Sequence, residues 1–199
     1  MILKISRGKT VMEGKILYRI IRSGRRSVSI SVFGDGTVLV RAPYLTPERE
    51  IEKIVESHRA WIEKALLKAE KAGEAAETAG KLTEDEIRSL AAKALSVIPG
   101  RVQHFAPLVG VTFGRITIRN QKTRWGSCSK AGNLNFNCLL MLAPPEVLDS
   151  VVVHELCHRK YMNHSAEFYA EVRRVYPDYD RCHKWLKEHG AELMARMGA

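Results

Sequence analysis

The sequence predicts an α+β fold, in which strands and helices occupy separate stretches of the chain. Over the first 45 residues apolar and polar residues alternate, which is the pattern of half-buried strands. From Thr46 onward the apolar residues recur every three or four positions, which is the pattern of amphipathic helices. Alternation returns after residue 111, between further helical segments. We therefore expect an N-terminal β region (1–45), a helical connection (46–100) and a C-terminal region of helices and strands (101–199).

The N-terminal β region is expected to be an antiparallel meander. The apolar residues of its strands are Ile16, Tyr18, Ile20, Val28, Ile30, Val32, Val38 and Val40. Gly34-Asp35-Gly36 separates the second and third groups and contains residues that tolerate positive φ, so we expect a tight hairpin there. Pro43 should end the sheet because it has no N–H to donate to a neighbouring strand.

Two helices are expected in the helical connection. Thr46-Pro47 supplies an N-cap and a proline at the first helical position, which favours one long helix after it. The stretch 71–81 lacks large apolar residues, so it is either an exposed helix end or a linker. Thr83 and Glu86 have the spacing of a capping box, which predicts a second helix that ends before Pro99-Gly100.

The C-terminal region is expected to contain two strands and three helices. A polar, glycine-containing loop separates the strands, and Pro144-Pro145 opens a helix whose apolar residues face inward. The strands are predicted at 112–119 and 134–142, the loop at 120–133, and the last two helices at about 165–175 and 180–197.

The composition indicates a globular protein. The 199 residues are 45% hydrophobic, which is sufficient for a packed core, and no apolar run reaches the roughly 20 residues of a membrane span. Charges interrupt the apolar residues that follow Met1, so no secretion signal is visible. The four cysteines form no C-x-x-C pair: Cys128, Cys138, Cys157 and Cys182. We expect a cytoplasmic protein with reduced, buried thiols.

The net charge makes nucleic acid a partner to consider. Lys and Arg number 32 against 22 Asp and Glu, which gives a formal charge of +10 and attracts polyanions at low salt. The basic residues are spread along the chain, with short clusters only at 22–26 and 119–124, and no recognition motif accompanies them. A solvated basic surface is therefore favoured over a nucleic-acid site.

The helix that opens at Pro144-Pro145 contains the pattern H-E-x-x-H. His154 and His158 are four residues apart, so both imidazoles lie on one helix face and can reach one metal ion. A catalytic zinc ion takes three protein ligands and a water molecule, and Glu155 is suited to accept a proton from that water. We therefore expect a hydrolase with one zinc ion per chain. Two surface histidines without a metal are the alternative.

The third ligand is expected downstream of this motif. His164 is the nearest candidate, six residues after the second motif histidine, and Asn163 tolerates the left-handed conformation that would turn the chain back. The metzincin pattern has the same separation, but Tyr161 stands at the position of its turn glycine. Glu167 and Glu171 are competing candidates, since many zinc hydrolases use a downstream glutamate.

Further motifs surround H-E-x-x-H in the sequence. They are Thr123-Arg124-Trp125-Gly126-Ser127-Cys128, Asn133-Leu134-Asn135-Phe136-Asn137, Ala143-Pro144-Pro145, Val151-Val152-Val153 before His154, and Asn163-His164-Ser165. Together with residues 18–43 they resemble the YgjP-like metallopeptidase family, and the resemblance spans most of the chain. It implies a zincin-like metallopeptidase core with His154, His158 and His164 as zinc ligands and Glu155 as the catalytic residue. Phe168-Tyr169 stands where the family usually has Phe-Trp, which we expect to alter only packing.

Other residues are candidates for holding a substrate. In zincin sites an extended peptide lies alongside an edge strand, and 134–142 is placed in the sequence to be that strand, although an ordinary core strand is equally compatible. Arg124 and Asn137 are candidate substrate or oxyanion contacts, with a structural role for Arg124 as the alternative. Trp125 is expected to anchor its loop by packing. His183 and His189 are expected to be surface residues, and His58 and His104 have no partner motif.

Hydrolysis of a peptide bond, in a peptide or protein substrate, is the expected reaction. Nucleoside triphosphate pyrophosphatase activity, with which this family has also been associated, would suit the basic surface, but neither a P-loop nor a paired-carboxylate magnesium motif is present. A DNA-associated protease similar to the SprT-like proteases is a further alternative, motivated by the charge of +10. A scaffold with a vestigial site conflicts with the intact Glu155. No feature of the sequence indicates the oligomeric state.

Overall fold

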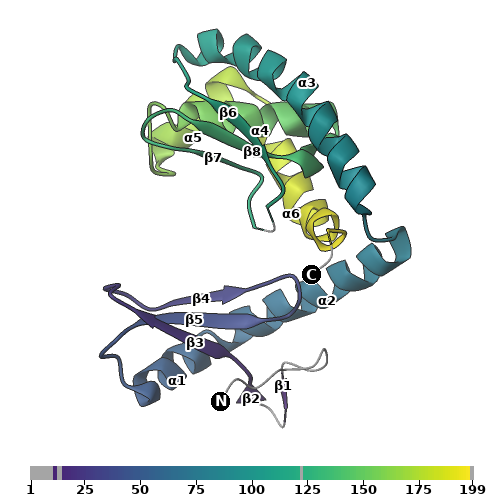
Figure 1. Ribbon diagram of the computed structural model, residues 1–199. Helices are drawn as coiled ribbons and strands as arrows, with labels where there is room; N and C mark the ends of the chain where they lie inside the picture. Colours follow the sequence, from purple (N-terminus) through teal and green to yellow (C-terminus); the bar gives the residue numbers. More distant parts are fainter. Residues whose placement is uncertain (1–10, 13–14, 122, 198–199) are drawn as a thin grey trace. The chain divides into compact units, whose positions relative to one another are not determined.

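The computed structural model describes residues 11–12, 15–121 and 123–197 (Figure 1). The chain divides into two compact units, one up to Ala75 and the other from Ala76 onward. Each unit contains both helices and strands, so the predicted α+β class is confirmed. None of the helices within these ranges combines the length and the apolar composition that crossing a lipid bilayer requires.

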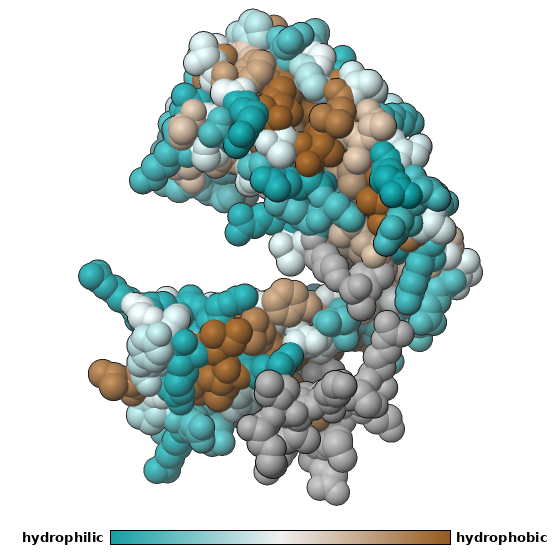
Figure 2. Space-filling view, in the orientation of Figure 1, coloured by the Kyte–Doolittle hydropathy of each residue, from teal (hydrophilic) through white to brown (hydrophobic). Residues whose placement is uncertain are grey.

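The N-terminal unit is built on a three-stranded sheet, preceded by a short hairpin. The hairpin consists of β1 (Val11–Met12) and β2 (Lys15–Ile16), and the sheet of β3 (Arg19–Ser23), β4 (Ser29–Val32) and β5 (Val38–Pro43). Strand β5 lies in the middle of the sheet, where β4 pairs with it antiparallel and β3 pairs with it parallel. Figure 2 shows apolar side chains exposed on this sheet. Ile21 of β3 is an exposed apolar residue, at 49%.

The parallel pair of β3 and β5 corrects the predicted antiparallel meander. The hairpin at Gly34-Asp35-Gly36 forms as expected, with Gly36 at a φ of 78°, and it joins β4 to β5. Strand β3 then lies on the other edge of β5, because Val38 and Val40 are almost fully buried and favour the central position. Alternation of apolar residues identifies strands but carries no information on which strands pair, and this is where the prediction failed.

Two helices cover the inner face of this sheet, α1 (Glu48–Ser57) and α2 (Arg59–Ala79). Their buried residues Ile51, Val55 and Ile62 join the core formed by the strands. The single long helix predicted from Thr46 is therefore two helices, since His58 ends the first with non-helical backbone angles (φ −104°, ψ 9°). Pro47, not Thr46, is the N-cap residue. The stretch 71–81 is helical as far as Ala79.

The longest helix, α3 (Glu84–Val109), is the first helix that lies wholly within the C-terminal unit. The capping box of Thr83 and Glu86 is present, as predicted. The predicted end at Pro99-Gly100 is wrong, because the helix continues to Val109 and ends at Gly110 with a φ of 75°. Buried residues on both sides of Pro99, among them Ile98 and Val102, supply apolar packing that outweighs the hydrogen bond lost at proline.

A second three-stranded sheet follows α3. It contains β6 (Ile116–Arg119), β7 (Gly126–Cys128) and β8 (Leu134–Asn137), with β8 in the middle, parallel to β6 and antiparallel to β7. The loop predicted at 120–133 thus contains a strand. Because β8 is paired on both sides, it is a central strand and not the predicted edge strand for a peptide.

The predicted strand 134–142 is correct only for its first four residues. A 3-10 helix, η1 (Cys138–Leu142), follows, and the side chain of Asn137 caps it by accepting a hydrogen bond from the Leu139 N–H at 3.1 Å. Cys138, Leu139 and Leu140 are all buried, and a short apolar run of this kind does not distinguish a buried strand from a buried turn of helix.

Three further helices complete the unit, and each begins within one residue of its predicted start. They are α4 (Pro145–Cys157), α5 (Ala166–Val175) and α6 (Tyr179–Ala195). Helix α4 contacts α3, α5, α6 and β7, so it is the central helix of the unit (Figure 1). The four cysteines are free, and three of them are buried.

Candidate metal centre

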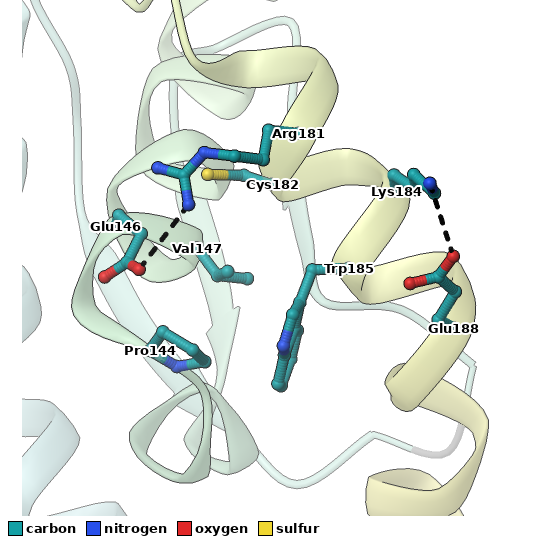
Figure 3. Close-up of a pocket in the computed structure, with 8 residues that line it drawn as sticks. All are labelled: Pro144, Glu146, Val147, Arg181, Cys182, Lys184, Trp185 and Glu188. Carbon is teal, nitrogen blue, oxygen red and sulfur yellow. Dashed lines mark ion pairs between the residues drawn. The ribbon is translucent and has the colours of Figure 1, made fainter.

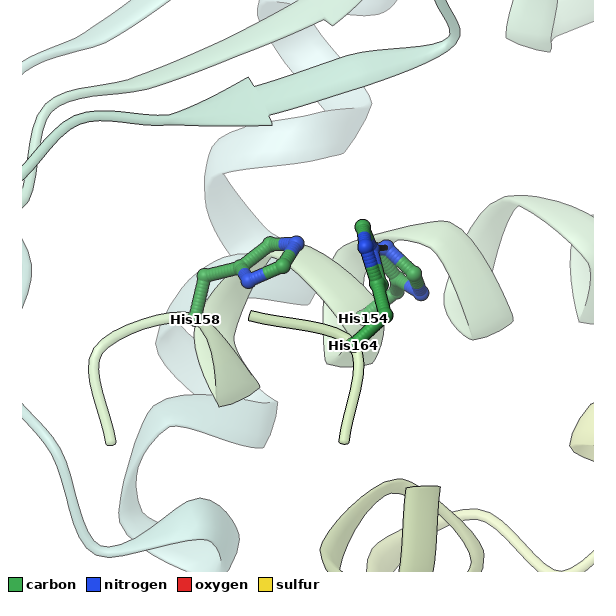
Figure 4. Close-up of side chains that lie close together, drawn as sticks. All are labelled: His154, His158 and His164. Atoms are coloured by element: carbon green, nitrogen blue, oxygen red, sulfur yellow. Dashed lines mark hydrogen bonds between the residues drawn. The ribbon is translucent and has the colours of Figure 1, made fainter. Parts of the chain in front are cut away.

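Three histidines converge at the C-terminal end of α4 (Figure 4). His154 lies in the last turn of the helix, His158 is its C-cap residue, and His164 comes from the loop that leads to α5. One ring nitrogen from each residue lies within 4.8 Å of the others, and the Nε2 atoms of His154 and His164 are 3.1 Å apart. The structure thus brings together the three residues that the sequence predicts as metal ligands.

The spacing of these nitrogen atoms is compatible with a shared metal ion. In a tetrahedral site with metal–nitrogen bonds of about 2.1 Å, two ligand nitrogens are separated by roughly 3.4 Å. The 3.1 Å between His154 and His164 is close to this separation. The residues present therefore fit a divalent transition-metal ion of the kind that imidazole ligands prefer.

The two helical histidines are held by partners behind them. Nδ1 of His154 is 2.9 Å from the hydroxyl oxygen of Tyr179 on α6, and Nδ1 of His158 is 3.0 Å from the backbone carbonyl oxygen of Tyr161. Such contacts fix the orientation of a ligand ring and leave Nε2 available for the ion.

Phe168 packs against all three histidines. It is fully buried on α5, and its ring centroid lies 4.9 Å from that of His154, 4.6 Å from His158 and 5.0 Å from His164. The helix that carries Phe168 begins directly after His164, because the Ser165 side chain caps it by accepting a hydrogen bond from the Phe168 N–H. The same local structure therefore places both Phe168 and His164.

Burial keeps the helical imidazoles neutral. Desolvation lowers the pKa of His154 to about 3, with smaller contributions from His158 and His164. Desolvation also lowers the pKa of His158, against the opposing effect of the Tyr161 carbonyl. A neutral imidazole has a free lone pair, so both rings are in the form that binds a metal at neutral pH.

Glu155 lies beside these ligands on α4 and is only 5% exposed. Burial raises the pKa of its carboxyl group to about 8, and the positive charge of Arg124 acts in the opposite direction. Among the described residues no group donates a hydrogen bond to this carboxylate. A metal cation in the histidine cluster would favour the ionised form, as opposite charges do.

The competing ligands predicted from the sequence are engaged elsewhere. Glu171 accepts hydrogen bonds from Lys160 and Arg174, which hold the pKa of its carboxyl group near 2. Glu167 is exposed, and a hydrogen bond from Ser165 lowers the pKa of its carboxyl group. Neither residue belongs to the histidine cluster.

The two candidate substrate contacts occupy different environments. Arg124 is exposed just before β7, where its charge reaches Glu155. Asn137 is 1% exposed, and its Nδ2 donates hydrogen bonds to the backbone carbonyls of Gln121 and Arg124. Since its Oδ1 caps η1, the Asn137 amide is occupied by backbone groups, and it holds in place the loop that carries Arg124.

Four further histidines and a surface pocket lie outside the histidine cluster. None of His58, His104, His183 and His189 contributes to it within the described residues. Figure 3 shows a pocket of about 230 Å³ walled by Trp185, with Glu146 and Arg181 paired on its rim. The three clustered histidines do not line this pocket.

Three residues that support the site are not identified by any sequence pattern used above: Tyr179, Phe168 as a packing partner of the histidines, and Gly126, which lies against Glu155. Tyr179 is 25 residues from His154 in the chain, and no spacing rule connects them. Gly126 stands in the motif Thr123-Arg124-Trp125-Gly126-Ser127-Cys128, which was the available signal that this loop serves the site.

One protein family and two solved structures match this chain. A family model described as the YgjP-like metallopeptidase domain matches residues 26–88 and 81–189. Two solved structures also match, and each match covers 46% of this chain and 94% of the chain in the solved structure. One is the metallopeptidase zymogen abylysin of Pyrococcus abyssi (21% identity, TM-score 0.42). The other is the metallopeptidase zymogen jannalysin of Methanocaldococcus jannaschii (23% identity, TM-score 0.41). No curated protein matches the chain. Because the family model extends over most of the sequence, the chain belongs to the YgjP-like metallopeptidase family and is a metal-dependent peptidase by that membership.

Proposed function

We propose that the protein is a zinc-dependent peptidase in which His154, His158 and His164 hold one zinc ion and Glu155 activates a water molecule. The observation that carries this proposal is the convergence of three imidazole rings beside a buried carboxylate on α4. Three imidazoles are a donor set of catalytic zinc sites, in which the fourth position is left to water or substrate.

The chemistry follows from the residues around this position. A zinc ion held by His154, His158 and His164 would lower the pKa of a bound water to about 7 and polarise the carbonyl group of the substrate. Glu155 accepts the proton of the attacking water and delivers it to the leaving amine. Burial of Glu155 raises its proton affinity, which suits a group that has to take up a proton and return it in each cycle.

Strand β7 is the element that we propose for holding the substrate backbone. Within the described residues β7 is hydrogen-bonded on one side only, to β8, and its first residue Gly126 lies against Glu155. An extended peptide can add to a free strand edge through main-chain hydrogen bonds. Arg124, next to this strand and near Glu155, supplies a positive charge for the developing oxyanion.

Metal content and peptide cleavage together test the proposal. We expect the purified wild type to hold about one zinc ion per chain, as a three-histidine site does, and to cleave members of an unbiased peptide library. Glu155→Gln should keep the metal and lose cleavage, while His164→Ala should lose both. His104→Ala, which removes an exposed histidine of α3, is the matched control and should behave as wild type.

Two results would contradict this function. A wild type that takes up no zinc from a metal-replete solution would exclude the histidine site as a zinc centre. Zinc-dependent release of pyrophosphate from nucleoside triphosphates, abolished in Glu155→Gln and without any peptide cleavage, would replace the peptidase by the alternative hydrolase.

A further inference from the structure

We propose that Gly126 is a positioning residue whose missing side chain makes the space that the Glu155 carboxylate occupies. A Cβ atom built on Gly126 would lie 2.6 Å from Oε1, 2.7 Å from Cγ and 2.9 Å from Cδ of Glu155. Side-chain carbon atoms do not approach other atoms this closely, so no larger residue fits without moving Glu155 or the strand. The inference rests on the proposed role of Glu155 as general base.

The backbone conformation does not explain a glycine at this position. The described glycines with positive φ are Gly36, Gly80, Gly110 and Gly132, and Gly126 is not among them. Any residue could adopt its backbone angles in strand β7. The need for glycine at this position is therefore a need for space.

The strand cannot easily withdraw from Glu155. Gly126 is paired in register with Phe136, which is 1% exposed, and the Asn137 N–H donates a hydrogen bond to the Trp125 carbonyl at 2.8 Å. Trp125 in turn packs against α6, where a Cβ on Gly190 would lie 3.1 Å from its ring. The backbone above Glu155 is thus held by β8 and, through Trp125, by α6.

Glu155 depends on this contact for its position. The carboxylate receives no hydrogen bond from the described residues, and its side chain is almost entirely enclosed on the central helix. Packing against Gly126 therefore limits where the carboxylate can lie. The surface against which it packs is the bare Cα of Gly126.

A double-mutant cycle on the melting temperature tests this relation without reference to activity. Gly126→Ala is measured in three backgrounds: wild type, Glu155→Gln and Glu155→Ala. Overpacking should lower the melting temperature by roughly 5 °C in the first two backgrounds, because Gln has the size of Glu. In the Glu155→Ala background the added methyl group fills the space left by the shortened side chain. Gly126→Ala should then lower the melting temperature by no more than about 1 °C. Equal shifts in all three backgrounds would overturn the proposal.

Activity and metal content complete the experiment. Gly126→Ala should reduce peptide cleavage at least tenfold through kcat and retain the zinc content of wild type, since it touches no histidine. Gly100→Ala is the matched control and should cleave as wild type, because nothing lies within 4 Å of its added Cβ. Wild-type cleavage by Gly126→Ala would also overturn the proposal. An inactive wild type would instead contradict the proposed function, while the melting temperatures still decide whether Gly126 and Glu155 share this space.

Discussion

Tyr179 links the proposed metal centre to α6, a helix that supplies none of its three histidines. Its hydroxyl lies 2.9 Å from Nδ1 of His154, and the residue is 3% exposed. Burial raises the pKa of the phenol, so the hydroxyl stays neutral and can accept a hydrogen bond from the Nδ1–H of His154. The position of one ligand ring thus depends on a residue of α6.

Replacing this hydroxyl tests its contribution to metal binding. Tyr179→Phe keeps the ring and removes the partner of His154, and losses of this kind weaken metal affinity by about 10- to 100-fold. Competition with a chromogenic zinc chelator measures the effect. Tyr169→Phe serves as control, since the described contacts of Tyr169 are made by its ring. Equal affinities of Tyr179→Phe and wild type would show that the contact is dispensable.

At the scale of elements, the segment between α4 and α5 decides whether His164 reaches the other ligands. Arg159 donates hydrogen bonds to the backbone carbonyls of Thr112 and Lys130, and Lys160 pairs with Glu171 on α5 at 2.7 Å. Arg174 pairs with the same glutamate. These contacts attach both sides of the segment to neighbouring elements, so His164 is presented by an anchored loop.

The Glu171 pairing predicts a stability that depends on pH. The pKa of its carboxyl group is lowered from 4.5 to about 2 in the folded protein. Its contribution is therefore complete above about pH 4.5 and is lost as the pH falls toward 2. At pH 7, Glu171→Gln should reduce the free energy of unfolding by about 1 kcal/mol, allowing for solvent screening.

Denaturant titrations at pH 7 and at pH 2 measure this difference. The stabilities of wild type and Glu171→Gln should converge at the lower pH, where Glu171 becomes protonated in both the folded and the unfolded chain. Glu188→Gln, which removes an exposed carboxylate of α6 from a loose pair with Lys184, should show a much smaller difference at pH 7. A constant difference between wild type and Glu171→Gln at both pH values would contradict the assignment.

The elements that the sequence predicted correctly are those set by local chemistry. The capping box at Thr83, the hairpin at Gly36 and the helix that opens at Pro145 depend on residues close together in the chain. The spacing of His154 and His158 places both on one helix face for the same reason. The continuation of α3 through Pro99 and the pairing of β3 with β5 depend on tertiary packing, which local patterns do not contain.

At the scale of the whole molecule, the candidate site belongs entirely to one unit. The three histidines, Glu155 and their supporting residues all follow Ala76, and this unit has a hydrophobic core of its own. Its two ends are joined by hydrogen bonds, from the Leu82 N–H to the Arg196 carbonyl at 2.8 Å and from Arg196 Nε to the Gly80 carbonyl at 3.0 Å. With its own hydrophobic core and joined ends, the unit meets the structural requirements of a domain that folds independently.

A fragment of residues 76–199 tests this independence. We expect it to unfold cooperatively and to bind zinc with the stoichiometry and affinity of the full chain, because every ligand and every supporting contact is retained. Circular dichroism during thermal unfolding and zinc titration are the measurements. A fragment with no cooperative transition would show that residues before Ala76 are needed to complete the fold.

Because Phe168 is buried in the core and contacts His154, His158 and His164, the three histidine rings become ordered when the core forms. One buried aromatic ring contacts all three imidazoles, so the same packing event that closes the core also restricts their rotamers. The entropy loss of arranging the ligands is then incurred during folding, before any ion arrives. Uptake of the proposed zinc ion should therefore require little further rearrangement, because the three rings already hold their rotamers.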